Sequence, residues 1–150
     1  MLNDTEFMRA AMDQARAAEA DGEVPVSAVI VRDGEIIATG RNRVITDSDP
    51  TAHAEIVAMR AAGIALGNYR LEGCDLYCTL EPCAMCAGAI LHARIRRLVY
   101  AASDPKAGAC GSVLGVMNHP QLNHKVEVVS GLLAEECGPM LTTFFRSRRQ

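Results

Sequence analysis

Two short motifs, thirty positions apart, constrain this chain more than any other feature of its sequence. His53 and Glu55 form a His-Ala-Glu motif, and Cys83 and Cys86 follow Pro82 in a Pro-Cys-Ala-Met-Cys motif. Each motif lies where a helix is predicted to begin. Cysteines three positions apart lie one helical turn apart, so both sulfurs can reach one ion. The helix dipole and its free N–H groups favour the thiolate forms that bind metals. The two motifs together therefore predict a metal site between two helix starts.

The number of ligands favours a catalytic metal site over a structural one. One imidazole and two thiolates supply three ligands, and a tetrahedral zinc ion in a catalytic site leaves its fourth position to water. A structural site would take a fourth Cys or His. Further residues of these types are present, but none forms a second CxxC motif or a histidine pair: Cys74, Cys78, Cys110 and His92. A thioredoxin-like redox pair is a further alternative, although it has no use for the histidine and the glutamate.

Glu55 lies two positions from a predicted ligand and is not itself needed as one. Two thiolates largely cancel the charge of a zinc ion, so the ion acidifies its water less than it would among neutral histidines, and an external base is useful. We expect Glu55 to take the proton of this water and to deliver it to a substrate. On position alone, a glutamate in a first helical turn more often stabilises the helix dipole. The neighbouring ligands favour the catalytic role.

Hydrophobic periodicity and turn residues predict strands that alternate with helices. Asn3 and Glu6 resemble a capping box before a helix that ends near Asp21, and an Asp-Gly pair at 33–34 predicts a hairpin of strands 24–31 and 35–39. The remaining predicted elements are a helix from Asp49–Pro50 to about Leu66, a strand at 75–80, a buried helix from Glu81–Pro82 to about Arg94, strands at 97–102 and 125–129, and a closing helix over 132–148. This order predicts one α/β domain over residues 1–150, built around a mixed sheet.

The charge of the chain is unevenly distributed. The formal net charge of −3 is unlike that of strongly basic domains that bind nucleic acid by bulk electrostatics. Residues 1–90 carry a net charge of −7, however, and residues 91–150 a net charge of +4, so we expect an anionic partner to meet the second segment. The longest nearly apolar run, 83–91, is too short to cross a membrane. The first residues do not resemble a signal peptide, so the expected location is the cytoplasm.

Taken together, the two motifs match the signature of zinc-dependent nucleoside and nucleobase deaminases. Longer segments, Asp49–Ile56, Thr79–Ile90 and Phe144–Arg149, are similar to the bacterial tRNA-specific adenosine deaminases, and the likeness covers essentially the whole chain. The segment 118–124 and the basic aromatic tail separate this family from the cytosine, guanine and riboflavin-pathway deaminases. The resemblance implies a three-layer α/β/α, cytidine-deaminase-like fold with a central mixed five-stranded sheet.

The resemblance also implies an activity, hydrolytic deamination of adenosine to inosine at the wobble position of a tRNA anticodon. The enzyme would be a hydrolase acting on a cyclic amidine C–N bond, with one zinc ion per subunit held by His53, Cys83 and Cys86. Zinc-activated water would attack C6 of the adenine, and Glu55 would carry its proton to the ring nitrogen and then to the leaving amine. The partners implied are a tRNA anticodon stem-loop and, because family members are homodimers, a second copy of the chain, with the helix over 84–91 as an interface element.

Nine further positions match family positions near the bound RNA: Asn42, Ala54, Asp104, Lys106, His119, Asn123, Phe144, Phe145 and Arg148. Several also have a structural explanation. Asn42 can support a turn, Asp104 can begin one before Pro105, and at least one of the two phenylalanines should belong to the core. The chain departs from the family pattern at Arg41, where an aromatic residue is common, and at the two residues beside Asp104. These departures touch loop contacts and leave the chemistry intact.

Two other functions stay open on the sequence alone. One keeps the chemistry but acts on a free base or nucleoside, of the guanine or cytosine type. The other is a non-catalytic zinc-binding or RNA-binding protein. Glu55 separates this last class from the enzymes, because a binding module needs the metal ligands but has no need of a proton shuttle.

Overall fold

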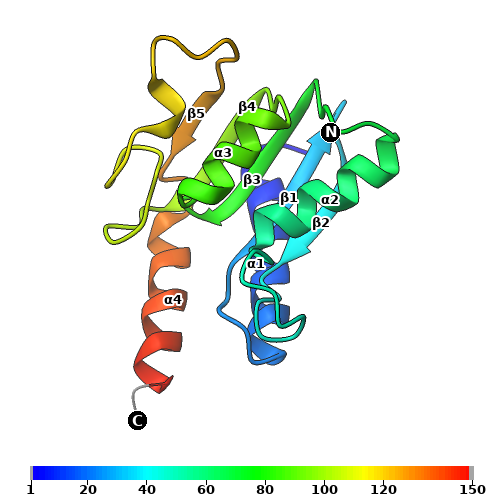
Figure 1. Ribbon diagram of the computed structural model, residues 1–150. Coiled ribbons are helices and arrows are strands. Elements are labelled where there is room, and N and C mark those ends of the chain that lie inside the picture. The colour runs from blue at the N-terminus through cyan, green and yellow to red at the C-terminus, as the bar shows by residue number, and fades with distance from the viewer. Residues whose placement is uncertain (1, 149–150) are drawn as a thin grey trace.

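A mixed five-stranded sheet forms the centre of the computed structural model, which describes residues 2–148 (Figure 1). The strands are β1 (Ser27–Arg32), β2 (Glu35–Arg41), β3 (Cys74–Leu80), β4 (Arg97–Ala102) and β5 (Glu127–Ser130). They lie in the order β2-β1-β3-β4-β5. β1 pairs with β2 and β3 in antiparallel fashion, whereas β4 is parallel to both β3 and β5. The predicted mixed sheet is therefore confirmed.

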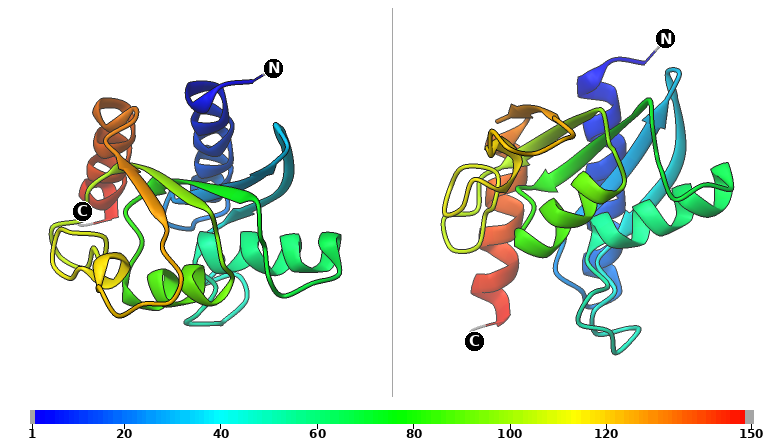
Figure 2. Two further views of the ribbon diagram at one scale, coloured as in Figure 1. Left: turned by 90° about the horizontal axis from the view of Figure 1, so that it is seen from above. Right: turned by 45° about the horizontal axis from the view of Figure 1, so that its top comes forward.

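Helices cover both faces of the sheet, as the view from above in Figure 2 shows. α2 (Ala54–Leu66) and α3 (Ala84–His92) lie on one face, and α1 (Asp4–Ala20) and α4 (Ala134–Arg148) lie on the other. Neighbouring residues of one strand point to opposite faces. Ile30 accordingly packs in the hydrophobic cluster that includes α2 and α3, while Val29 packs in the cluster that includes α1 and α4. These layers confirm the three-layer α/β/α fold.

Local signals correctly placed the first helix and the first hairpin. The side chain of Asn3 accepts the N–H of Glu6 at 3.0 Å, which makes Asn3 the N-cap of α1. Asp33 and Gly34 both have a positive φ, 52° and 79°, as a tight turn between paired strands requires. β1 begins at Ser27 rather than at Val24, because Pro25 has no N–H to donate to a strand partner.

The two helices that follow the motifs begin later than the sequence predicted. α2 starts at Ala54, not at Asp49–Pro50, because the Asp49 carboxylate accepts the N–H and the hydroxyl of Thr51, both at 2.8 Å, and so forms a local turn instead of a helix cap. α3 starts at Ala84, not at Pro82, with the extended residue Cys83 as its N-cap. His53 is likewise the N-cap of α2. One predicted metal ligand thus lies at the N-cap of each helix.

α3 is not buried on all sides as its apolar sequence suggested. Cys86, Ala87 and Ile90 are buried against the sheet, whereas Met85 is 38% exposed and Ala84 is exposed beside it. The prediction was wrong because an apolar sequence does not show whether a second protein surface covers the outer face of a helix.

The C-terminal elements also begin slightly later than predicted, β5 at Glu127 and α4 at Ala134. Leu133, with a φ of +60°, turns the chain just before α4 begins. Within residues 2–148, no helix is long and apolar enough to cross a membrane.

Candidate active site

The fold brings the three predicted metal ligands to one point. Nδ1 of His53 lies 3.6 Å from Sγ of Cys83 and 3.6 Å from Sγ of Cys86, and the three ligand atoms all lie within 4.8 Å of one another. Tetrahedral zinc, with bonds of about 2.0 Å to nitrogen and about 2.3 Å to sulfur, separates such a nitrogen and sulfur by about 3.6 Å. The observed triangle therefore fits a tetrahedral zinc ion and leaves its fourth position open.

The charge state of the ligands suits a metal cation. Hydrogen bonds from the Cys86 thiol and from His53 lower the pKa of Cys83 to about 3. The hydrogen bond with Cys83, together with burial, raises the pKa of Cys86, and the bond with Cys83 raises that of His53. The site thus holds one thiolate readily, and binding of a divalent metal releases the proton of the second thiol.

Glu55 lies beside the ligands in the first turn of α2 and is 4% exposed. Burial, which disfavours the charged form, raises the pKa of this carboxyl above its ordinary value. A carboxylate with a raised pKa is a better base toward a water molecule than an ordinary glutamate, and once protonated it can give the proton back. The arrangement can therefore move a proton between water and a bound group.

A cavity of about 190 Å³ opens next to the ligands. Its size admits one small planar group. Three of the residues predicted to contact substrate lie in its wall together with two of the predicted metal ligands, His53 and Cys83. The lining consists of Val24, Val26, Asn42, His53, Ala54, Glu55, Leu80, Glu81, Cys83, Asp104 and Ala107.

A second, wider cavity of about 640 Å³ shares Leu80 and Asp104 with the first. Lys106 and Phe145 line it, and Phe145 is 45% exposed. Phe144, in contrast, is buried, and the guanidinium of Arg148 lies over its ring at 4.8 Å from the centroid. The prediction that one phenylalanine belongs to the core is confirmed.

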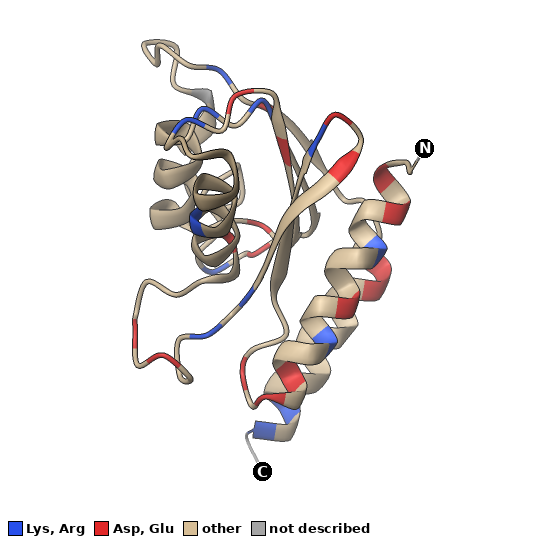
Figure 3. Cartoon of the chain, turned by 90° about the vertical axis from the view of Figure 1, so that its right-hand side faces the viewer, with Lys and Arg blue, Asp and Glu red and all other residues tan. Residues whose placement is uncertain are grey.

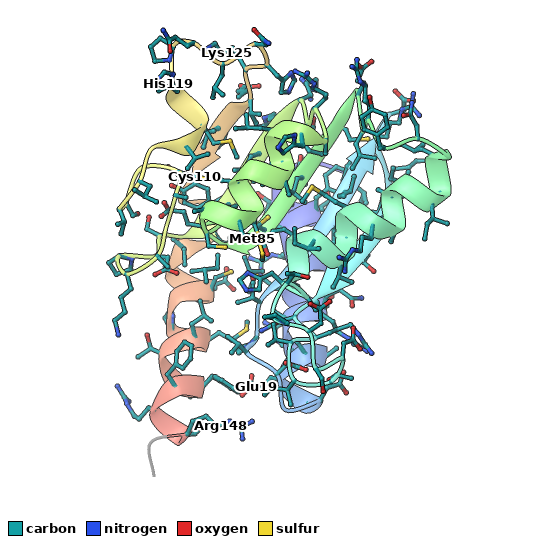
Figure 4. All side chains as sticks on the ribbon, viewed as in Figure 1. Glu19, Met85, Cys110, His119, Lys125 and Arg148 are labelled. Carbon is teal, nitrogen blue, oxygen red and sulfur yellow. The ribbon has the colours of Figure 1, made fainter. Side chains whose placement is uncertain are left out.

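His119 and Asn123 lie away from both cavities, on the exposed loop that follows η1 (Val116–Asn118). Figure 4 shows His119 at the top of the molecule and Arg148 at its foot. Close to this loop, a third cavity of about 470 Å³ is lined by Arg70, Glu72, Gly73, Arg94, Arg96, His124 and Lys125. We call it the basic hollow, and Figure 3 shows several Lys and Arg residues on the loops at the top, with Asp and Glu residues among them.

The sequence alone does not indicate the roles of three residues near these cavities: Arg70, Glu23 and Glu81. Arg70 belongs to the acidic segment 1–90, so the division of charge along the chain did not assign it to the basic hollow. Glu23 and Glu81, which are 1% and 2% exposed, look like ordinary surface glutamates in the sequence. Glu23 accepts the N–H groups of Ile45 and Thr46, at 3.2 and 2.6 Å, and so anchors the loop after Asn42. No local signal distinguishes such a glutamate, because its partners are distant in the sequence.

Comparison with known proteins yields one family model and a consistent set of relatives. Residues 1–102 match the model of the cytidine and deoxycytidylate deaminase zinc-binding region. The tRNA-specific adenosine deaminase of Haemophilus influenzae is 55% identical over 98% of this chain and 86% of its own length.

Solved structures of deaminases share the fold of this chain. One structure has a TM-score of 0.88 and 50% identity, over 91% of this chain and 99% of that one. It comes from studies of A-to-I editing by tRNA:A34 deaminases at the wobble position of transfer RNA. A guanine deaminase from Bacillus subtilis has a TM-score of 0.67 and 37% identity, over 99% of this chain and 94% of that one.

Proposed function

The chain belongs to the zinc-dependent cytidine and deoxycytidylate deaminase family, and within it to the tRNA-specific adenosine deaminases, and we propose that it converts adenosine to inosine at the wobble position of a tRNA anticodon. The observation that carries this function is the triangle of His53, Cys83 and Cys86 with buried Glu55 at the wall of one small cavity. The catalytic unit is a single zinc-dependent deaminase domain that spans residues 1–150.

The reaction consumes water and releases ammonia. His53, Cys83 and Cys86 would hold the zinc ion, which would supply Lewis-acid activation of the water. Glu55 accepts one proton of the water and donates it to a ring nitrogen of the adenine. It then takes the second proton from the hydroxyl group that has bonded to C6 and donates it to the amine, which leaves as ammonia. Because Glu55 begins and ends this sequence ionised, one buried carboxyl serves both proton transfers.

Asn42 and Ala54 would hold the base in the first cavity. The side-chain oxygen of Asn42 accepts the N–H of Val44 at 3.3 Å, which leaves its amide NH₂ to donate to the nucleotide. Ala54 is the first residue of α2, so its N–H has no partner within the helix and can donate to the base or to the attacking water.

The second cavity would take the nucleotides beside the target. Phe145 offers an exposed ring on which a base can stack, and Lys106 offers a cation for a phosphate. Asp104, which lines both cavities, would contact the nucleotide backbone between them. Phe144 and Arg148 would support Phe145 from the core and the surface of α4.

A second copy of the chain would cover the outer face of α2 and α3. An apolar groove of about 840 Å³ lies between these helices and is lined by the exposed side chains of Ile64 and Tyr69, and Met85 is exposed on α3. Contiguous exposed apolar surface of this kind marks a protein interface. In a homodimer, His119, Asn123 and the basic hollow of one subunit would meet the stem of an RNA bound at the partner's pocket. We place this enzyme in the cytoplasm, with its tRNA substrate.

A free-base deaminase is the second candidate, because the Bacillus subtilis guanine deaminase is 37% identical over almost the whole chain. The deciding experiment supplies an anticodon stem-loop with adenosine at the wobble position and, separately, free adenosine, guanine and cytosine, and measures inosine and ammonia. We expect inosine from the stem-loop alone. Equal turnover of a free base or nucleoside would favour the second candidate.

Replacement of Glu55 tests the mechanism separately from metal binding. The E55A variant should retain about one zinc ion per chain, because the three ligands are intact. It should release no ammonia, because the proton shuttle is gone. Persistent deamination by this variant would contradict the role of Glu55.

A further inference from the structure

Glu81 is a buried carboxylate whose partners all belong to one loop. It is 2% exposed, and the ion pairs found within residues 2–148 do not include it. Its Oε1 accepts the N–H of Asp104 at 3.0 Å, and its Oε2 accepts the N–H groups of Cys110 and Ser112 at 3.0 and 3.1 Å. The Ser112 hydroxyl also donates to Oε1. A single carboxylate thus ties both ends of the loop 104–112 to the end of β3.

The loop is built to close tightly around this carboxylate. A Cβ atom at Gly108 would overlap the carboxylate of Glu81 and would lie 2.6 Å from the carbonyl oxygen of Asp104. The N–H of Gly108 donates to that same carbonyl at 3.0 Å. Only glycine leaves room here, so the fold of the loop and the position of Glu81 depend on each other.

The loop carries the residues that stand where the two cavities meet. Asp104 lines both cavities, Ala107 lines the smaller one and Lys106 lines the larger one. The Asp104 carboxylate accepts the N–H groups of Lys106 and Ala107, at 3.0 and 3.2 Å, so these residues move with it. The bond from Asp104 to Glu81 therefore fixes three cavity-lining residues at once.

Main-chain bonds of Glu81 and of the next residue, Pro82, also link this region to the predicted metal site. Glu81 lies two positions before the ligand Cys83, its N–H donates to the carbonyl of Ala102 at 2.8 Å, and the N–H of Ala109 donates to the carbonyl of Pro82 at 2.9 Å. These bonds fix the position of the loop 104–112 relative to the segment that carries the predicted ligand Cys83.

We propose that Glu81 is a positioning residue for the deamination of RNA, which holds Asp104 and Lys106 at the junction of the two cavities. It lines the cavity wall, but its oxygens are taken up by the loop, so it acts on the nucleotide through Asp104. The proposal rests on the proposed function, since it assigns Glu81 a part in placing an RNA nucleotide at the metal site.

The E81Q variant tests this role with almost no change in shape. A glutamine has one oxygen, and its NH₂ group faces N–H donors, so about half of the bonds to the loop are lost. We expect KM for the stem-loop to rise roughly tenfold, the effect of losing about one hydrogen bond to a charged group, with a smaller change in kcat. Zinc content should stay at the wild-type value.

A double-mutant cycle with D104A decides whether Glu81 acts through Asp104. If it does, E81Q should raise KM in the wild-type background and have no further effect in the D104A background. Additive effects in the two backgrounds would overturn the proposal. S112A, which removes only the hydroxyl donor, keeps the test available if E81Q does not fold, and its smaller rise in KM should vanish in the D104A background too.

A matched control separates positioning from general destabilisation. D4N also replaces a bonded carboxylate, but Asp4 binds Arg97 at the opposite end of the sheet, so its KM should equal that of the wild type. An equal rise in KM for D4N would overturn the proposal, as would loss of zinc from E81Q with an unchanged KM. Failure of the wild-type chain to form inosine would instead refute the proposed function.

Discussion

Gly40 of β2 packs against the first turns of α2 so closely that a single added methyl group should disturb the active site. A Cβ atom at this position would overlap the carbonyl oxygen of Ala54 and would lie 2.5 Å from the backbone nitrogen of Ala58. Both obstacles are backbone atoms, which cannot rotate away. To restore an ordinary contact, β2 and α2 must separate by roughly 1 Å in G40A.

Whether β2 or α2 moves to make this space, a residue of the cavity is displaced. The end of β2 leads into Asn42, and the start of α2 carries His53 and Glu55. Overpacking of this kind costs about 1–3 kcal/mol of stability. For a chain of 150 residues this lowers the melting temperature by roughly 2–4 °C per kcal/mol. Misplacement by about 1 Å lowers the catalytic rate by about 100-fold.

G63A is the matched control for G40A. Gly63 lies in α2, the helix against which Gly40 packs, but a Cβ atom at Gly63 would meet only the carbonyl oxygen of Asn68 at 3.4 Å, an ordinary contact. Because alanine is favoured over glycine inside a helix by about 0.5–1 kcal/mol, G63A should retain or gain stability and keep its activity. The assays are thermal unfolding, zinc content and kcat on the stem-loop. Wild-type kcat in G40A would refute the view that this contact positions the site.

Two further predictions follow from the surface of the molecule. Arg97 lowers the pKa of Asp4 to about 2 from 3.8, so the stability that this pair confers is present above pH 3.8 and is lost as the pH falls toward 2. The melting temperature of the wild type should therefore fall between pH 3.8 and 2, and that of D4N, which lacks the carboxylate, should fall less over the same range. An unchanged acid profile would contradict the pairing. Met85 lies on the apolar face proposed for the dimer, so M85D should shift the chain toward monomers in sedimentation velocity at an unchanged zinc content. A wild type that is monomeric at all concentrations would contradict this interface.

The parts of the fold that the sequence predicts well are those specified by neighbouring residues. The cap at Asn3 and the turn at Asp33–Gly34 each depend on a side chain or a backbone conformation within a few positions. The predicted start of α2 was wrong because Asp49 has two local uses, as a helix cap or as the acceptor in a turn with Thr51, and the sequence does not choose between them.

The cluster of predicted metal ligands was predictable for a different reason. Their residue types and spacing have few other uses, so the sequence alone indicated that His53, Cys83 and Cys86 meet at one point, as they do in the fold. Glu81 has no such signature. Its importance arises from donors that lie 23 to 31 positions further along the chain, and only the folded structure brings them to its carboxylate.

The distribution of charge shows how a chain with a net charge of −3 can bind an RNA. Three of the fourteen acidic residues of the first segment are buried inside the fold. Glu23 and Glu81 anchor loops, and Glu55 is buried at the site, so these carboxylates do not repel a phosphate from the surface. Arg70 of the acidic segment meanwhile joins Arg94 in the basic hollow. Because charges act over only about 8 Å in physiological salt, the local surface decides the binding of RNA and the net charge of the chain does not.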